Sequence, residues 1–268
     1  MFKTPEPLSP DKHRQLKLNS QPDYRFSAEQ IVCPIVSGEK WPIAREYIMV
    51  FQLQKDSLPL AIMGTQSGVN AYLGDGNPPW WGRYVPAHFR RYPFITAPAQ
   101  NQPNDNPDQQ RFSVLIDTSA PQLSEEVGQP IFNEDGSGTG LLEKIQTALL
   151  SLQQDFGITQ KLVNQIDQAG LLVEQALTVK PTDAEPVALA GFRVVDQTKL
   201  RNLQPEKLSE LIKTGALDLI YAHIGSLSNL QDGLLAKKAS GQLKNQAANE
   251  DFDLDQYFGE NNDDSLKF

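Results

Sequence analysis

Two kinds of apolar pattern follow one another along this chain, and their order limits the folds it can adopt. The first half holds short runs rich in β-branched and aromatic residues, which are bounded by turn residues and predict strands. In the second half apolar residues recur at three- and four-residue steps, which predicts amphipathic helices. The two patterns do not alternate as they would in a parallel βαβ sheet. We therefore predict an α+β fold with a largely antiparallel sheet from the first half, helices mainly from the second half, and disordered termini.

The individual elements are placed by their apolar runs and turn residues. Strands are predicted at residues 26–36, 45–53, 57–66, 69–75, 111–119, 171–179 and 187–196. The longer helices are predicted at residues 141–157, 158–170, 205–214 and 216–239. Gly157 is expected to end the first of these helices, and Gly215 to cap the third. A short helix should begin near Pro86 and end at Pro93, because proline is tolerated only in a first helical turn.

The chain of 268 residues is long enough for one large domain with a sizeable core. We predict a single α+β domain at residues 23–244, preceded by a polar, proline-rich mobile leader at residues 1–22. Residues 97–110 contain three prolines and no apolar residue larger than alanine, which predicts a surface loop. Residues 245–268 are expected to form an acidic, disordered tail.

The formal net charge of −9 is concentrated near the C-terminal end. Seven acidic residues and no cation lie between Lys244 and Lys267, so the rest of the chain carries only about −2. We expect no nucleic-acid partner, because phosphate binding requires a positive face. In this tail apolar side chains alternate with carboxylates. A segment of this composition can bind to a basic, apolar groove of a partner protein.

The cellular compartment is predicted from what the sequence lacks. No run approaches the roughly 20 apolar residues that cross a bilayer, and the N-terminal segment has no apolar core of the kind a secretory signal needs. We therefore expect a soluble protein without membrane insertion, cytoplasmic by default. The single cysteine, Cys33, excludes an internal disulfide and a cysteine-ligated metal site within one chain.

Residues 80–94 hold the densest group of aromatic and cationic side chains. The candidate binding residues are Trp80, Trp81, Arg83, Tyr84, His88, Arg90, Arg91 and Tyr92. Aromatic planes beside guanidinium groups suit peptide, glycan or carboxylate ligands, through stacking and bidentate hydrogen bonds. In the alternative interpretation the rings enter the core, while the arginines cover its rim and pair with carboxylates. Adjacent residues point about 100° apart on a helix, so at most one of Arg90 and Arg91 is expected to face any single pocket.

No complete catalytic signature is present. His88 and His223 could form an iron site with an aspartate such as Asp117 or Asp196, but the histidines lack the spacing of a ligand motif. His223 falls on an apolar helix face, which favours a hydrogen-bonded core histidine. We therefore predict no catalytic residues and no metal ligands.

Two glycine-containing segments also fail to match a ligand-binding template. Residues 136–140 precede a helix but match neither the phosphate-loop pattern nor the dinucleotide fingerprint. Residues 133–144 end in Lys144, where a calcium-binding loop needs a glutamate. We therefore predict no cofactor.

Several segments together resemble the SapC family of bacterial proteins. They are YIMVFQ (47–52), LPLAIMG (58–64), NAYLGDG (70–76), YVPAHFRRYPF (84–94), FSVLID (112–117), QPIFNEDG (129–136), GFRVVDQTKLRNL (191–203) and GALDLIYAHIGSLSNL (215–230). The chain departs from the family pattern between Leu73 and Trp81, where GDGNPPW stands in place of an acidic residue and a simpler Gly-x-Trp turn.

The resemblance implies a bacterial protein of a family named from a locus for a paracrystalline surface layer. Members are also encoded near outer-membrane uptake receptors, flavin-dependent tryptophan halogenases and cupin-like oxygenases. No catalytic residue is established for the family, so the resemblance transfers none to this chain. On the family resemblance alone, the protein can associate with the cell surface even though its sequence predicts no signal peptide.

Three functions are compatible with these observations. The first is a non-enzymatic accessory or binding protein of a bacterial surface-layer or outer-membrane uptake system, which binds a protein or peptide through residues 80–94. The second is an enzyme or enzyme partner that acts on peptides or aromatic amino acids in a locus with a halogenase or oxygenase. The third is a structural component of a surface layer. A pocket that combines His88, an arginine and a carboxylate would favour the enzyme, and a flat aromatic patch would favour the binding protein.

Overall fold

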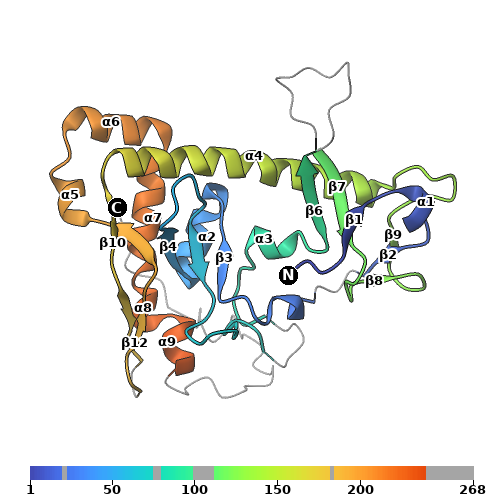
Figure 1. Ribbon diagram of the computed structural model, residues 1–268, viewed down its shortest axis with the longest axis horizontal. Coiled ribbons are helices and arrows are strands. Elements are labelled where there is room, and N and C mark those ends of the chain that lie inside the picture. The colour runs from blue at the N-terminus through green and yellow to red at the C-terminus, as the bar shows by residue number, and fades with distance from the viewer. Residues whose placement is uncertain (20–22, 75–79, 99–111, 182–183, 240–268) are drawn as a thin grey trace, which may run out of the picture.

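The computed structural model describes residues 1–19, 23–74, 80–98, 112–181 and 184–239 (Figure 1). Every pairing between the described strands is antiparallel, and helices pack against the sheets. The predicted α+β class is therefore confirmed. None of the described helices is long and apolar enough to cross a membrane.

The central sheet has five strands in the order β10-β13-β4-β5-β3. Their bounds are β3 (Val32–Pro34), β4 (Ile48–Gln52), β5 (Leu60–Ile62), β10 (Leu172–Glu174) and β13 (Phe192–Val195). The middle strand, β4, has four consecutive buried residues, Ile48 to Phe51, none of them more than 1% exposed. A strand this apolar is buried on both of its faces, and the main hydrophobic core forms around it.

Helices α2 (Lys40–Glu46) and α7 (Ala216–Ser226) pack against β4 of this sheet, and α7 also packs against β13. The other helices of the second half are α5 (Gln197–Arg201), α6 (Pro205–Thr214), which packs against α7, and α8 (Asn229–Asp232) and α9 (Leu234–Ala239), which pack against each other. Two side chains of α7 join it to β4: His223 Nδ1 bonds to the carbonyl oxygen of Met49 at 2.8 Å, and the Met49 N–H donates to Ser226 Oγ at 3.0 Å. His223 is therefore a hydrogen-bonded core histidine, as the sequence favoured.

Smaller sheets form the other end of the molecule (Figure 1). The first contains β1 (Pro5–Pro7), β7 (Phe112–Asp117) and β6 (Phe94–Pro98), and the second contains β8 (Leu123–Ser124), β2 (Lys17–Leu18) and β9 (Gln129–Pro130). Helix α1 (Pro10–His13) lies between β1 and β2 in the sequence. The pair β11 (Leu177–Val179) and β12 (Val187–Leu189) stands apart from them.

The N-terminal segment is part of the fold. Strand β1 pairs with β7, and the backbone N–H groups of Lys3 and Thr4 donate to the Asp117 carboxylate. The prediction of a mobile leader is therefore wrong for residues 1–19. The proline-rich composition of this segment suggested a mobile chain, but proline is tolerated in an edge strand such as β1.

The longest helix, α4 (Gly140–Gln168), connects the two ends of the molecule (Figure 1). Its first half contributes Leu142 and Leu149 to a small core with Phe94, and its second half contributes Leu162 and Ile166 to the main core. The predicted break at Gly157 is wrong, since the helix continues through this residue. A glycine in a helix costs only about 1 kcal/mol, and packing at both ends outweighs that cost.

Two other predicted elements, a strand and a helix, differ from the structure. The strand is absent because a side chain forms hydrogen bonds with the backbone. Residues 69–75 were predicted as a strand, but Asn70 donates to the Ser27 carbonyl oxygen and accepts from the Tyr72 N–H, which favours a turn. The helix predicted over 216–239 is divided into α7, α8 and α9. Gly215 has a φ of +82° and ends α6, as predicted.

The short helix predicted near Pro86 is present as α3 (Ala87–Arg90). Within the predicted loop, residues 97–98 belong to β6. Residues 99–110 and the predicted acidic tail (245–268) lie outside the described residues.

Candidate functional site

Trp80, one of the candidate binding residues, lies in the main core and is only 7% exposed. Its indole N–H donates to the hydroxyl oxygen of Tyr47 at 3.1 Å and to the carbonyl oxygen of Tyr84 at 3.3 Å. Its ring is packed against the rings of Tyr24, Tyr72 and Phe89. For Trp80 the alternative interpretation, a core aromatic residue, therefore describes the structure.

Tyr92 is also largely buried, at 9% exposure. Its ring stacks on Phe26 with 3.9 Å between the ring centroids, and its hydroxyl group donates to Asp117 at 3.4 Å. Burial and the nearby Asp117 carboxylate raise the pKa of Tyr92 to about 12. Tyr92 is thus held as a neutral, packed side chain next to the N-terminal strands.

Trp81 and Arg83 line a different cavity from the one that Arg90 and Arg91 line. Its volume is about 440 Å³, and it lies between α2 and helices α8 and α9. The Lys238 ammonium lies 5.0 Å from the centroid of the Trp81 ring, and the backbone N–H of Arg83 donates to Glu46 at 2.8 Å. The candidate residues of the 80–94 tract are therefore divided between the core and two different cavities.

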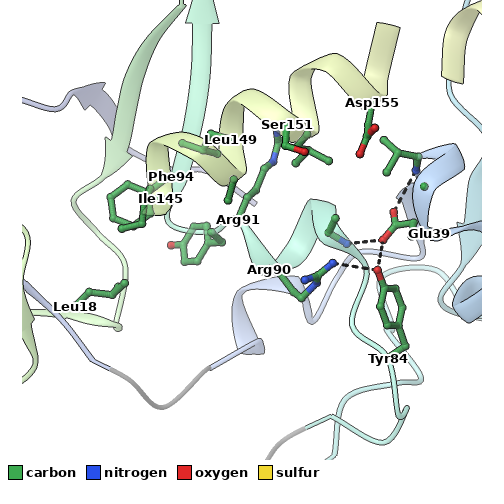
Figure 2. A pocket seen from close by; sticks show the side chains of 16 residues that line it. Leu18, Glu39, Tyr84, Arg90, Arg91, Phe94, Ile145, Leu149, Ser151 and Asp155 are labelled. Carbon is green, nitrogen blue, oxygen red and sulfur yellow. Dashed lines mark hydrogen bonds between the residues drawn. The ribbon is translucent and has the colours of Figure 1, made fainter. Parts of the chain in front are cut away.

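The larger of these cavities is a cleft of about 470 Å³, here called the α3–α4 cleft. It lies between α4 on one side and α3 with the 3-10 helix η2 (Ser37–Glu39) on the other (Figure 2). The residues that line it are Leu18, Val36, Gly38, Glu39, Tyr84, Ala87, Arg90, Arg91, Tyr92, Phe94, Ile145, Ala148, Leu149, Ser151, Leu152 and Asp155.

Glu39 fixes one end of the cleft. Its side chain is 4% exposed and accepts three hydrogen bonds, from the Val36 N–H at 3.1 Å and from the Tyr84 hydroxyl and the Ala87 N–H at 2.8 Å each. Burial raises the pKa of the Glu39 carboxyl group, and the hydrogen bonds partly oppose this shift. Because Ala87 is the first residue of α3, Glu39 holds the start of this helix in place.

Tyr84 connects Glu39 to Arg90 (Figure 2). The Tyr84 hydroxyl group donates to Glu39 and accepts from Arg90 Nη2 at 3.0 Å, while Arg90 Nε donates to the carbonyl oxygen of Val85 at 2.9 Å. Burial and the neighbouring Glu39 raise the pKa of Tyr84 to about 12. The Arg90 guanidinium group is exposed and lies over the Tyr84 ring at 5.3 Å.

Arg91 is partly buried and has no carboxylate partner among the described residues. Its guanidinium carbon lies 5.7 Å from the ring centroids of both Phe2 and Phe156, and its Nη2 approaches His88 Nδ1 at 3.2 Å. The buried Nε has no hydrogen-bond partner among the described residues. Burial lowers the pKa of Arg91.

His88 supports Arg91 from outside the cleft and is not among the residues that line it. Burial, Arg91 and the amino group of Met1 lower the pKa of His88 to about 3. The imidazole ring is therefore neutral near pH 7, and its Nδ1 can accept a hydrogen bond from Arg91. The cleft therefore does not combine His88 with an arginine and a carboxylate, the arrangement that would have favoured an enzyme.

Helix α4 forms the opposite wall. Ile145, Leu149 and Leu152 give it an apolar surface, and Asp155 lies one turn beyond them. The Asp155 carboxylate is directed towards the η2 turn and accepts no hydrogen bond or ion pair from the described residues (Figure 2). A Cβ atom built on Gly38 would lie 3.4 Å from Asp155 Oδ2, so the two residues are close.

Both adjacent arginines line the cleft, and the prediction that only one could do so is wrong. The backbone of Arg91 is still helical, and its N–H donates to the carbonyl oxygen of Ala87 at 3.1 Å, so the directions of the two long side chains decide the outcome. Arg91 extends towards Ser151 on α4, whereas Arg90 turns towards Tyr84 (Figure 2). Within the described residues, no group of three or more histidine, cysteine, aspartate or glutamate side chains could hold a metal ion.

Sequence reasoning missed Glu39 and Asp155. Nothing in the sequence marks Glu39 as a site residue, since it is one glutamate in a short turn. Asp155 could have been noticed, because Ala148, Leu152 and Asp155 are spaced four and three residues apart and share a face of α4. That face could not be assigned to a cleft without knowing that α3 packs beneath it.

Comparison with known proteins gives a family but no characterised relative. The sequence model of the SapC family matches residues 8–232, which is most of the chain. No curated protein and no solved structure matches it. The match extends from α1 to α8, so it includes both walls of the α3–α4 cleft. The chain belongs to the SapC family.

Proposed function

We propose that this protein is a non-enzymatic binding protein that holds a peptide segment of a partner in the α3–α4 cleft. It would act as an accessory component of a bacterial surface-layer or outer-membrane uptake system, the setting that the family resemblance implies. The observation that carries this proposal is Arg91, a partly buried cation in a cleft without an acidic partner among the described residues.

The charge of Arg91 supports an anionic ligand. Burying a guanidinium group without a counter-charge is costly, and proteins usually avoid it by pairing. In this cleft the oxygens of Glu39 already accept three hydrogen bonds, and Asp155 makes no ion pair with Arg91. An incoming carboxylate would compensate the charge of Arg91 where this residue lines the cleft.

The shape and composition of the cleft support a peptide. Asp155 lies ten positions after Ile145 on α4, a distance of about 15 Å along the helix. An extended peptide of about four to five residues covers this length. The volume of about 470 Å³ falls within the usual range of ligand pockets, and an apolar wall with a few polar groups is their usual lining.

The aromatic residues of the 80–94 tract have different roles in this proposal. Trp80 is packed in the core and would hold the cleft in shape, whereas Tyr84, Arg90, Arg91 and the largely buried Tyr92 line it. Trp81 and Arg83 line the other cavity and are not required.

A peptide-binding assay tests the proposal. Fluorescence-labelled peptide libraries are screened against the full-length protein and three variants: Arg91→Gln, Ala148→Trp and the control Arg83→Gln. Ala148 is exposed and lines the cleft, so a tryptophan there should fill the cleft without disturbing the core. We expect binding to be weakened about tenfold or more in Arg91→Gln, lost in Ala148→Trp and retained in Arg83→Gln. The absence of any bound peptide, or equal affinities in all variants, would refute the proposal.

A further inference from the structure

We infer that the α3–α4 cleft recognises the free C-terminal residue of a peptide, with its α-carboxylate at Arg91 and its apolar side chain beside the first turns of α4. This inference rests on the proposed function and specifies the part of the partner that enters the cleft. It follows from the order of three environments along α4.

The first environment is apolar and lies at the end of the cleft nearest β2 and β6 (Figure 2). Its lining residues are Leu18, Phe94, Ile145, Ala148 and Leu149. These residues come from three segments, β2, β6 and α4, that converge on the small core, of which Phe94 and Leu149 are members. No charged side chain lines this end, so it suits an aliphatic or aromatic side chain.

The second environment is the guanidinium group of Arg91, which extends to α4 beside Ser151 (Figure 2). It follows the apolar end directly, because Ser151 is only two residues beyond Leu149 on α4. A carboxylate placed here would receive charge-assisted hydrogen bonds from Arg91. The rings of Phe2 and Phe156 hold the guanidinium group in position, so little side-chain freedom is lost on binding.

The third environment is the Asp155 carboxylate, one helical turn beyond Ser151. It is an acceptor with no bond from the described residues, and it lies next to Gly38. A backbone N–H group of the ligand can donate to it, and the peptide chain can then continue past Gly38. A second carboxylate at this point would be repelled by Asp155.

An apolar subsite directly beside the anion-binding subsite at Arg91 favours a C-terminal residue over an internal acidic one. A C-terminal residue carries its carboxylate and its side chain on the same Cα atom, so both groups reach neighbouring subsites together. In an extended internal segment, successive side chains point to opposite faces, so an aspartate and its apolar neighbour cannot both enter. The N–H group of a preceding residue supplies the donor for Asp155, so the cleft holds more of the peptide than its terminal residue.

Paired peptide libraries test this inference. Both contain hexapeptides with acetylated N-termini that are randomised at the last two positions; one ends in a free carboxylate and the other in a carboxamide. We expect the free-acid peptides with apolar last residues to bind about tenfold or more tightly than their amides. In Arg91→Gln this preference should disappear, whereas Asp155→Ala should weaken acids and amides by the same factor. The control Arg83→Gln should keep the preference.

The outcomes separate the inference from the proposed function. Amides that bind as tightly as acids, with binding still lost in Ala148→Trp, would overturn the C-terminal recognition and leave peptide binding in the cleft intact. Binding of free leucine or phenylalanine as tightly as the peptides would also overturn it, because the ligand would then be an amino acid. If neither library binds at all, the proposed function itself fails.

Discussion

The carboxylate of Glu39 accepts a 2.8 Å hydrogen bond from the hydroxyl group of Tyr84, which joins two segments 45 residues apart. The same oxygen accepts the Ala87 N–H at the start of α3. One buried side chain therefore sets where α3 begins and where Tyr84 and Arg90 stand in the cleft. Glu39 thus positions the cleft residues, and its two oxygens already accept three hydrogen bonds in doing so.

Replacing Glu39 with alanine should lower the free energy of unfolding by about 3 kcal/mol, because buried donors lose their acceptor. Val36, Tyr84 and Ala87 supply those donors. Urea denaturation followed by circular dichroism measures the change. Glu210→Ala, on an exposed face of α6, is the matched control and should stay within about 0.5 kcal/mol of the wild type. Equal effects of the two substitutions would contradict the role of Glu39.

Trp80 should behave as a core residue and not as a ligand-binding residue. Trp80→Ala removes a side chain that is 7% exposed and leaves a cavity, so we expect a loss of about 4 kcal/mol in unfolding free energy. Trp41 is 52% exposed, and Trp41→Ala should change stability by less than about 1 kcal/mol. Thermal and chemical denaturation of both variants measures this difference. A Trp80→Ala protein as stable as the wild type would contradict its place in the core.

Gly157 and Gly215 should respond in opposite ways to alanine. In Gly157→Ala the new methyl group meets no atom within 4 Å inside a continuous helix, so unfolding free energy should rise by about 0.5–1 kcal/mol. Gly215 has a left-handed backbone, so Gly215→Ala should lower it by about 1 kcal/mol. Denaturant melts compare the pair. Destabilisation by Gly157→Ala would instead support a helix break at this residue.

His223 and His88 should make the protein less stable in acid. Burial lowers the pKa of His223 to about 4 and that of His88 to about 3, both below the ordinary 6.5. The unfolded chain therefore binds more protons than the folded protein below pH 6.5. The stability is fully present above pH 6.5 and is lost as the pH falls towards these two values, by up to about 1.4 kcal/mol per pH unit for each histidine.

The His223→Gln variant isolates one of these contributions. In the folded protein His223 Nε2 accepts the Val195 N–H at 3.2 Å, a bond that protonation of this nitrogen would break. Unfolding free energies measured from pH 6.5 to pH 4.5 should therefore fall less steeply in His223→Gln than in the wild type. The two slopes should differ by the contribution of one proton, up to about 1.4 kcal/mol per pH unit. Identical slopes in the two proteins would show that His223 does not titrate in this way.

The amino-acid sequence by itself determined the α+β class, most strand positions and the cap at Gly215. These features depend on local pattern: a strand such as β4 is apolar over four consecutive residues, and glycine is the residue that adopts φ = +82° at little cost. The family resemblance was also readable in the sequence, because short motifs such as YVPAHFRRYPF do not depend on the fold being known.

The tertiary structure decided the rest. Gly157 reads locally as a helix stop, but the two cores that α4 joins keep the helix continuous. Trp80 and Arg91 belong to one aromatic and cationic tract, yet one is in the core and the other lines a cleft. Glu39 and Asp155 enter the site from segments more than a hundred residues apart. Burial and hydrogen bonding depend on which distant segments meet, and the periodicity of the sequence does not contain that information.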